Sequence, residues 1–176
     1  MPERAGTVRL LSTLPGYFWA ASVAVAAADL ITKHFVFERL PEKLSAPIIV
    51  VGRFLRIVHS ENRGGVFGLG QGSVAWLVFG VVAGGLVVWF AHRKDAKGLL
   101  VQLALGLVLG GAIGNLFDRL SLGYVRDFID VCYWPGKHWP AFNVADAGIC
   151  VGAVYLAAHA FFFTHKEGKA TERKGR

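Results

Sequence analysis

The chain is poor in the residues and motifs on which many catalytic sites depend. It holds two cysteines in 176 residues; Cys132 and Cys150 lack metal-ligand spacing, and we interpret both as packing residues rather than a disulfide. It has no His-Glu-x-x-His, no Gly-x-Ser-x-Gly and no phosphate-binding glycine loop. Its histidines are scattered, and no serine pairs with a histidine or lysine. The acids are the remaining candidates for chemistry, and we expect no metal and no cofactor.

Charge is also scarce for a protein of this size. Charged residues make up 18% of the chain, and the net charge is +7. The basic residues form no stripe interleaved with aromatic residues on a polar face, so no nucleic-acid partner is expected. Hydrophobic residues reach 54%, the mean hydropathy is +0.47, and the 22 glycines suit close helix packing in lipid. The composition therefore predicts an integral membrane protein.

Four apolar stretches are each near the roughly 20 residues that a helix needs to cross a bilayer. They cover about residues 17–37, 73–91, 98–117 and 147–164. We predict a mainly α membrane fold, with one four-helix domain over 1–164 and a basic, disordered tail over 165–176. Glycines repeat every fourth residue at Gly106, Gly110 and Gly114, with similar pairs at Gly80/Gly84 and Gly148/Gly152. We interpret these ladders as helix-packing surfaces.

The distribution of charge predicts the orientation. Lys and Arg are densest in the N-terminal segment, the 92–97 link and the tail, so the positive-inside rule places both termini in the cytoplasm. Segments 38–72 and 118–146 then face outward. An alternative remains open at the N-terminus, where Arg4, Arg9 and the alanines at 26–28 resemble a cleavable signal peptide.

The outward segments carry apolar and aromatic residues. Residues 48–51 and 54–58 are mostly apolar and rich in β-branched side chains, and Gly52-Arg53 between them suits a two-residue hairpin turn. We expect a small sheet on the outer membrane surface. The aromatic 130–141 loop either clamps a substrate or, through Trp134 and Trp139, forms an interfacial belt.

Two aspartates border this aromatic loop. Asp127 follows the third span, and Asp146 lies where the fourth begins. Asn143 is a candidate N-cap, which places Asp146 at the third helical position, where an acid commonly caps. The helix N-terminus would keep Asp146 ionised, and a nearby Asp127 would then be driven toward its protonated form. An acid/base pair that activates water and an ordinary helix cap both remain open.

Other polar residues lie near the outer ends of the spans. Helical spacing places Gly111, Asn115, Asp118 and Arg119 near one face of the third span. Asp118 and Arg119 either form an ion pair that ends the helix or serve the site. In the first span Asp29 and Lys33 form an i, i+4 pair, most simply with Lys33 reaching outward toward water.

Five blocks of the sequence together resemble one known family. They are Asp29-x-x-x-Lys33, Asn62-x-Gly64-x-x-Phe67-Gly68, Gly110-Gly111-Ala112-x-Gly114-Asn115-x-x-Asp118-Arg119, Val125-x-Asp127-Phe128 and Phe142-Asn143-x-Ala145-Asp146. In this order and spacing they resemble the lipoprotein signal peptidase (signal peptidase II) family, over about residues 17–164.

The resemblance implies an aspartic peptidase of the bacterial cytoplasmic membrane with its site near the outer face. Its expected substrates are prolipoproteins whose lipobox cysteine carries diacylglycerol, cut just before that cysteine. By the same resemblance Asp127 and Asp146 are the catalytic pair. The implied support and substrate-binding residues are Asn62, Gly64, Asn115, Asp118, Arg119, Asn143, Asp29 and Lys33. Membrane lipid and globomycin-type inhibitors are the other expected partners, and a monomer is expected.

Two other functions are open from the residues alone. A small proton-coupled transporter also buries acids in helices, but it should show a repeat or broken helices at mid-membrane. A non-catalytic membrane assembly factor would tolerate Asp127→Asn with little loss beyond stability.

Overall fold

Four long helices and one small antiparallel sheet form the described part of the chain. The computed structural model describes residues 14–40, 46–64, 74–93, 96 and 98–174, with the backbone alone from 163 onward. The helices are α1 (Gly16–Arg39), α2 (Val74–Ala91), α3 (Leu99–Leu122) and α4 (Val144–Lys174). Each contains a stretch long and apolar enough to cross a membrane, which confirms the predicted fold class.

Three helices extend beyond their predicted ends, α1 by two residues to Arg39. α3 continues five residues past 117 to Leu122 and ends at Gly123, whose φ of 78° is in the left-handed region and whose N–H bonds the Arg119 carbonyl oxygen. α4 continues to Lys174, so the expectation of a disordered tail from residue 165 is wrong. Ser73, the predicted start of the second span, and Arg4 and Arg9 lie outside the described residues.

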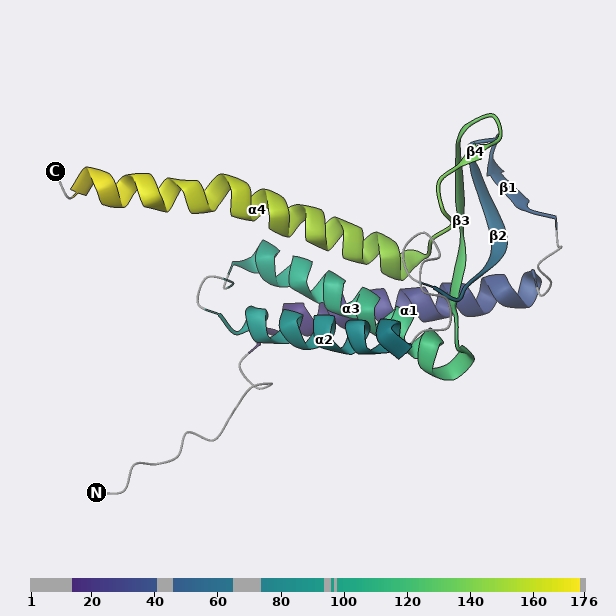
Figure 1. Ribbon diagram of the computed structural model, residues 1–176, viewed down its shortest axis with the longest axis horizontal. Coiled ribbons are helices and arrows are strands. Elements are labelled where there is room, and N and C mark those ends of the chain that lie inside the picture. The colour runs from purple at the N-terminus through teal and green to yellow at the C-terminus, as the bar shows by residue number, and fades with distance from the viewer. Residues whose placement is uncertain (1–13, 41–45, 65–73, 94–95, 97, 175–176) are drawn as a thin grey trace, which may run out of the picture.

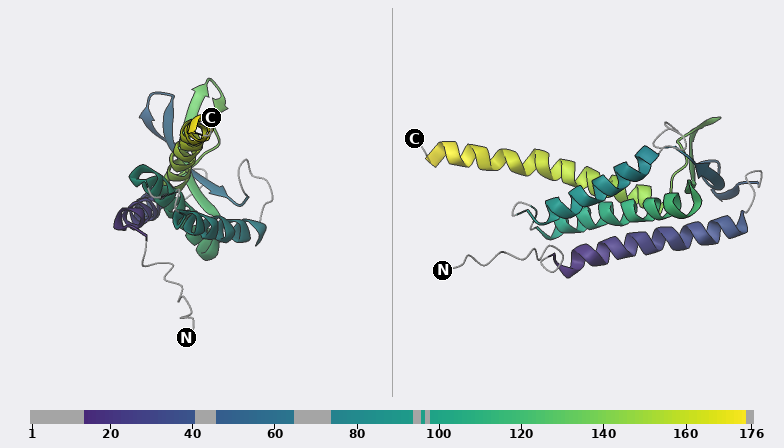
Figure 2. Two further views of the ribbon diagram at one scale, coloured as in Figure 1. Left: turned by 90° about the vertical axis from the view of Figure 1, so that its left-hand side faces the viewer. Right: turned by 60° about the horizontal axis from the view of Figure 1, so that its bottom comes forward.

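The helices alternate in direction, and the sheet lies at one end of the bundle (Figure 1). α1 and α3 run toward the sheet, whereas α2 and α4 run away from it. α3 packs against each of the other three helices, and 56% of its span is buried against 6% for α2. α3 is therefore the central helix, and α4 projects beyond α2 and α3 on the side away from the sheet (Figures 1 and 2).

Glycines let α1 and α4 approach the backbone of α3. A Cβ added at Gly106 or Gly110 would overlap the carbonyl oxygens of Phe18 or Ser22 on α1, and one at Gly111 would overlap that of Ala145 on α4. The predicted packing role of the α3 ladder is confirmed. The α2 pair differs, because added Cβ atoms at Gly80 and Gly84 would meet only leucine side chains at 3.6 and 3.7 Å.

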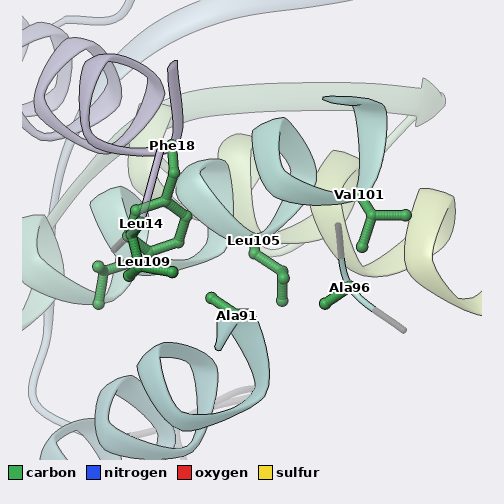
Figure 3. Close-up of a cluster of buried hydrophobic side chains, with 7 residues drawn as sticks. All are labelled: Leu14, Phe18, Ala91, Ala96, Val101, Leu105 and Leu109. Atoms are coloured by element: carbon green, nitrogen blue, oxygen red, sulfur yellow. The ribbon is translucent and has the colours of Figure 1, made fainter. Parts of the chain in front are cut away.

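A buried apolar cluster closes the end of the bundle away from the sheet (Figure 3). Its members come from the residues just before α1, the start of α1, the end of α2, the following link and α3: Leu14, Phe18, Ala91, Ala96, Val101, Leu105 and Leu109. The buried Gln102 side-chain amide donates hydrogen bonds to the carbonyl oxygens of Ala91 at 2.8 Å and Ala96 at 2.6 Å. These bonds hold the link between α2 and α3 against the bundle.

The sheet has four strands in the order β1-β2-β3-β4. They are β1 (Ile48–Val51), β2 (Leu55–Asn62), β3 (Val125–Trp134) and β4 (Lys137–His138). The predicted hairpin is confirmed, but its turn has three residues, 52–54, rather than two, with Gly52 at φ 48°. The predicted aromatic loop over 130–141 is wrong, since β3 continues to Trp134 and pairs with β4.

Candidate functional site

The pairing of β2 with β3 brings a polar strand to the helix ends. Asp127 lies on β3 opposite Ser60 of β2, and Asp146 lies in the first turn of α4. Asp127 is 2% exposed, whereas Asp146 is only half-buried. Two carboxyl groups from different elements therefore share one site but differ in their access to water.

Asn143 contacts both aspartates. Its side-chain amide donates a hydrogen bond to Asp127 Oδ1 at 2.7 Å, and its backbone N–H donates to Asp146 Oδ2 at 3.2 Å. In return the Asp146 N–H donates to Asn143 Oδ1 at 2.9 Å. The reciprocal pair is a capping box at the start of α4. The predicted N-cap is confirmed, and the cap itself joins the two aspartates.

The surroundings of Asp127 favour its protonated form. Burial, followed by the negative charge of Asp146, raises the pKa of Asp127 from its ordinary value of 3.8 to about 7. Hydrogen bonds from Asn143 and from the Asn62 side-chain amide, at 3.1 Å from Asp127 Oδ2, act in the opposite direction. Burial outweighs these bonds, so Asp127 gains a proton near neutral pH.

Asn115 connects Asp146 to a buried lysine. Its side-chain amide donates to Asp146 Oδ1 at 2.7 Å, while its own oxygen accepts from Lys33 Nζ at 3.0 Å and from Asn143 Nδ2 at 3.1 Å. The partners that the Asn115 side chain requires among apolar neighbours are thus supplied by Lys33 of α1, Asp146 of α4 and Asn143, the residue that caps α4. The amide orientation is fixed, because its donor end faces a carboxylate and its acceptor end faces an ammonium group.

Lys33 does not reach toward water, so that expectation is wrong. Its Nζ lies 2.7 Å from Asp29 Oδ2 and 3.2 Å from Asp118 Oδ2, and all three side chains are fully buried. The other Asp29 oxygen accepts the Ala145 N–H at 2.9 Å, which ties α1 to the first turn of α4. Gly114 makes room for this carboxylate, since a Cβ there would overlap Asp29.

Asp118 and Arg119 do not form the ion pair with each other that one interpretation of the sequence predicts at the end of this helix. Asp118 binds Lys33 and Arg126. The Arg119 guanidinium instead donates to the carbonyl oxygens of Gly64 at 3.3 Å and Asn115 at 3.5 Å. Gly64 is itself held by its N–H, which donates to Asn62 Oδ1 at 3.1 Å.

The structure brings every predicted site residue into one connected group. Those residues are Asp29, Lys33, Asn62, Gly64, Asn115, Asp118, Arg119, Asp127, Asn143 and Asp146. Sequence reasoning missed Arg126, because nothing in its spacing distinguishes it from other basic residues near a span end. Phe67 and Gly68 of the second sequence block lie outside the described residues.

A small cavity of about 130 Å³ opens beside this group. It is lined by the end of β2, the start of α2, and the turn after α3: Asn62, Arg63, Val74, Trp76, Leu77, Arg119, Gly123 and Tyr124. Asn62 joins it to Asp127, and Arg119 joins it to Asn115. Within the described residues, no group of three or more His, Cys, Asp or Glu side chains is arranged to hold a metal ion.

Comparison with known proteins points to one family. Residues 21–162 match the profile of a family described as Signal peptidase (SPase) II. A lipoprotein signal peptidase of Syntrophotalea carbinolica is 41% identical over 75% of this chain and 83% of its own length. A lipoprotein signal peptidase of Pseudoalteromonas atlantica is 37% identical over 82% of this chain and 88% of its own length. Among solved structures, a bacterial membrane enzyme is similar, with a TM-score of 0.76 and 27% identity over 85% of this chain and 90% of that one.

Proposed function

The chain belongs to the signal peptidase II family of membrane aspartic peptidases, and from that premise we propose which bond it cuts and with which residues. It is a multi-pass bacterial membrane peptidase that processes lipoproteins. The proposed reaction removes the signal peptide from prolipoproteins whose lipobox cysteine already carries diacylglycerol, by cleaving just before that cysteine. Family membership replaces the transporter and assembly-factor hypotheses.

Asp127 and Asp146 form the proposed catalytic pair. The observation that carries this assignment is Asn143, which hydrogen-bonds both carboxyl groups and so holds them at one site. Burial of Asp127 and capping of α4 by Asp146 make the two acids unequal. A proton-donating and a proton-accepting carboxyl group are what attack by water on a peptide bond requires.

The proposed mechanism is direct attack by water, with no acyl-enzyme. Ionised Asp146 takes a proton from the water molecule, and the oxygen of that water bonds to the scissile carbonyl carbon. Protonated Asp127 donates a hydrogen bond to the carbonyl oxygen and stabilises the tetrahedral intermediate. The C–N bond then breaks as the departing nitrogen receives a proton from the pair. Such proton transfers typically contribute about 10²–10⁴-fold in rate.

The remaining residues have supporting roles in this proposal. Asn115 and Asn143 orient the two carboxyl groups, while Asp29, Lys33 and Asp118 tie α1 to α3 and to the first turn of α4. Asn62 and Arg119 line the cavity beside the aspartates, where they would hydrogen-bond the substrate backbone. Gly64 keeps Arg119 in place through its carbonyl oxygen.

Orientation and partners complete the proposal. Both termini lie in the cytoplasm, the sheet and the site lie at the outer face, and the enzyme works as a monomer. The acyl chains of the substrate lie in lipid, and globomycin-type peptides bind in place of the substrate. Tyr133, Trp134 and Trp139 on the sheet are 57–65% exposed, which suits contact with the membrane interface or with substrate.

The deciding experiment is cleavage of a diacylglyceryl-modified prolipoprotein by purified protein in detergent. Wild type should cut, and Asp127→Asn and Asp146→Asn should each lose at least about 10²-fold in kcat while still unfolding cooperatively on heating. Glu38→Gln is the matched control. This acid lies at the end of α1 nearest the sheet, but its side chain is 61% exposed. Near-normal cleavage by either folded Asn variant would remove that aspartate from the mechanism.

A further inference from the structure

Arg126 attaches the strand that carries Asp127 to the end of α3. Its backbone N–H donates to Asp118 Oδ2 at 3.0 Å, and its guanidinium donates to Asp118 Oδ1 at 2.6 Å through one nitrogen and at 3.1 Å through another. Asp118 is fully buried, and the Arg126 side chain is only 14% exposed. One carboxylate thus fixes both the backbone and the side chain of the residue immediately before Asp127.

The far side of the Arg126 guanidinium is also enclosed. Its Cζ lies 5.9 Å from the centre of the Phe37 ring on α1, and the His59 ring of β2 packs on the same Phe37 at 4.1 Å. The Arg126 carbonyl oxygen accepts from Asn143 Nδ2 at 3.3 Å. Arg126 therefore contacts α1, α3 and the cap of α4 as well as its own strand.

The buried charges beside the two aspartates balance only when Arg126 is counted. Asp29 and Asp118 are negative, and Lys33 and Arg126 are positive, with direct contacts along the series Asp29–Lys33–Asp118–Arg126. We call these four residues the buried charge group. Without Arg126 the group has two carboxylates and one ammonium, and a buried uncompensated charge is costly.

We propose that Arg126 is a positioning residue for the reaction: it fixes the strand that carries Asp127 and keeps the buried charge group neutral beside the two aspartates. The inference rests on the proposed function. Arg126 stands at the unspecified position of the block Val125-x-Asp127-Phe128, so it lies outside the residues that carry the family resemblance.

Neutrality matters because Asp127 is sensitive to the charges around it. Asp146 of α4, Lys33 of α1 and Arg119 of α3 interact with Asp127 directly. Asp29, Asp118 and Arg126 are the charged groups joined to that Lys33 in the buried charge group. Glu61 of β2 faces Arg126 in the strand register but has Arg63 as a partner at 3.1 Å. Removing the positive charge of Arg126 makes the surroundings of Asp127 more negative, which favours its protonated form.

The test measures kcat and KM for prolipoprotein cleavage as a function of pH. In wild type, kcat should fall as pH rises through the value at which Asp127 ionises. Arg126→Gln should lower kcat and move this midpoint upward by roughly half a pH unit or more. Asp118→Asn, which makes the group net positive, should move the midpoint downward.

Two further variants separate charge from geometry. Asp118→Asn/Arg126→Gln restores a neutral group, so its midpoint should return toward wild type while kcat stays low. Arg126→Lys keeps the charge but loses the planar fork, so it should keep the midpoint and lose kcat. Arg53→Gln, which removes an exposed arginine from the hairpin turn, is the control and should change neither quantity.

The inference is overturned if Arg126→Gln changes only the melting temperature and keeps the wild-type kcat and midpoint. It is also overturned if Arg126→Lys shifts the midpoint as far as Arg126→Gln does. If Arg126→Gln does not fold, the double variant and Arg126→Lys give the same decision. Absence of cleavage by wild type is a separate outcome, which refutes the proposed function together with this inference.

Discussion

At the scale of single residues, the two aspartates show how surroundings make identical side chains unequal. Asp127 is enclosed between β3, β2 and the α4 cap, whereas Asp146 retains access to water and a place in the first turn of a helix. The sequence predicts that the two acids are unequal, from the position of Asp146 at a helix N-terminus, but it does not predict the burial that is the larger cause for Asp127. It did not predict the two amides on Asp127, because Asn62 is 65 residues away along the chain.

The raised pKa of Asp127 predicts how its replacement affects stability at different pH. With a folded pKa of about 7 against an ordinary 3.8, the folded chain holds this proton more tightly than the unfolded chain. As pH rises from about 4 to about 7, the unfolded state ionises first, and this residue increasingly destabilises the fold. Above about 7 the penalty stays constant.

Asp127→Asn cannot ionise and so avoids this penalty. We expect its melting temperature, relative to wild type, to increase between about pH 4 and pH 7 and then level off. Thermal unfolding in detergent at several pH values measures the difference. A difference that is constant with pH would show that Asp127 titrates alike in both states.

Lys33 shows why a lysine near a helix end need not reach outward toward water. The behaviour of a lysine near a helix end depends on its neighbours, and here α3 offers a carboxylate and an amide oxygen at 3.2 and 3.0 Å. Only the intrahelical partner, Asp29, is visible in the local sequence. The other two contacts require the packing of α1 on α3.

Lys33→Met should destabilise the protein by about 3–5 kcal/mol, because it leaves Asp29 buried without its counter-charge. Asp29→Asn/Lys33→Met removes both charges and should recover part of that loss. Melting temperatures in detergent compare the single and double variants. Equal stability of wild type and Lys33→Met would contradict the buried ion pair.

At the scale of elements, the helices were predictable and the sheet was only partly so. Each span is a local property of hydropathy, and the observed helices contain most of every predicted span. The β1–β2 hairpin is also local, because Gly52 supplies its turn. The β2–β3 pairing joins two strands that are separated in the chain by α2 and α3. The aromatic residues of β3 give no local indication that this segment pairs with β2.

The α3 glycines predict a contrast between helix interfaces. Gly110→Ala places a methyl group into the Ser22 backbone of α1, so α1 must move; we expect a cost of roughly 1–3 kcal/mol and a loss of activity. Gly84→Ala is the matched control, since its added methyl group meets only the Leu109 side chain at 3.7 Å. Melting temperature and cleavage rate measure both variants. Comparable losses would show that the interfaces are equally tight.

At the scale of the whole molecule, the outer surface of the bundle is suited to lipid. Large apolar side chains on α2 such as Phe79 and Trp89 are 64% and 56% exposed, and apolar surface of this kind is covered in a soluble protein. The buried Asp29, Lys33 and Asp118 of the site lie on α1 and α3, and the buried Asp127 lies on β3. The bundle thus has an apolar exterior and a polar interior at its sheet end.

Orientation gives a prediction for the whole protein in its membrane. With Cys132 and Cys150 replaced by serine, Lys137→Cys on exposed β4 should react with a membrane-impermeant thiol reagent added outside intact cells. Arg93→Cys, at the opposite end of the bundle after α2, should react only after permeabilisation. Labelling in the reverse order would invert the proposed topology.

The bond from the Ala145 N–H to Asp29 joins the first helix to the last across 116 residues. During synthesis the first three helices are made before Ala145 and Asp146. At that stage Asp29 has no helix to cap, and Asp127 has neither Asn143 nor a second carboxylate. On the proposed assignment of the catalytic pair, the site is therefore not assembled until the fourth helix docks.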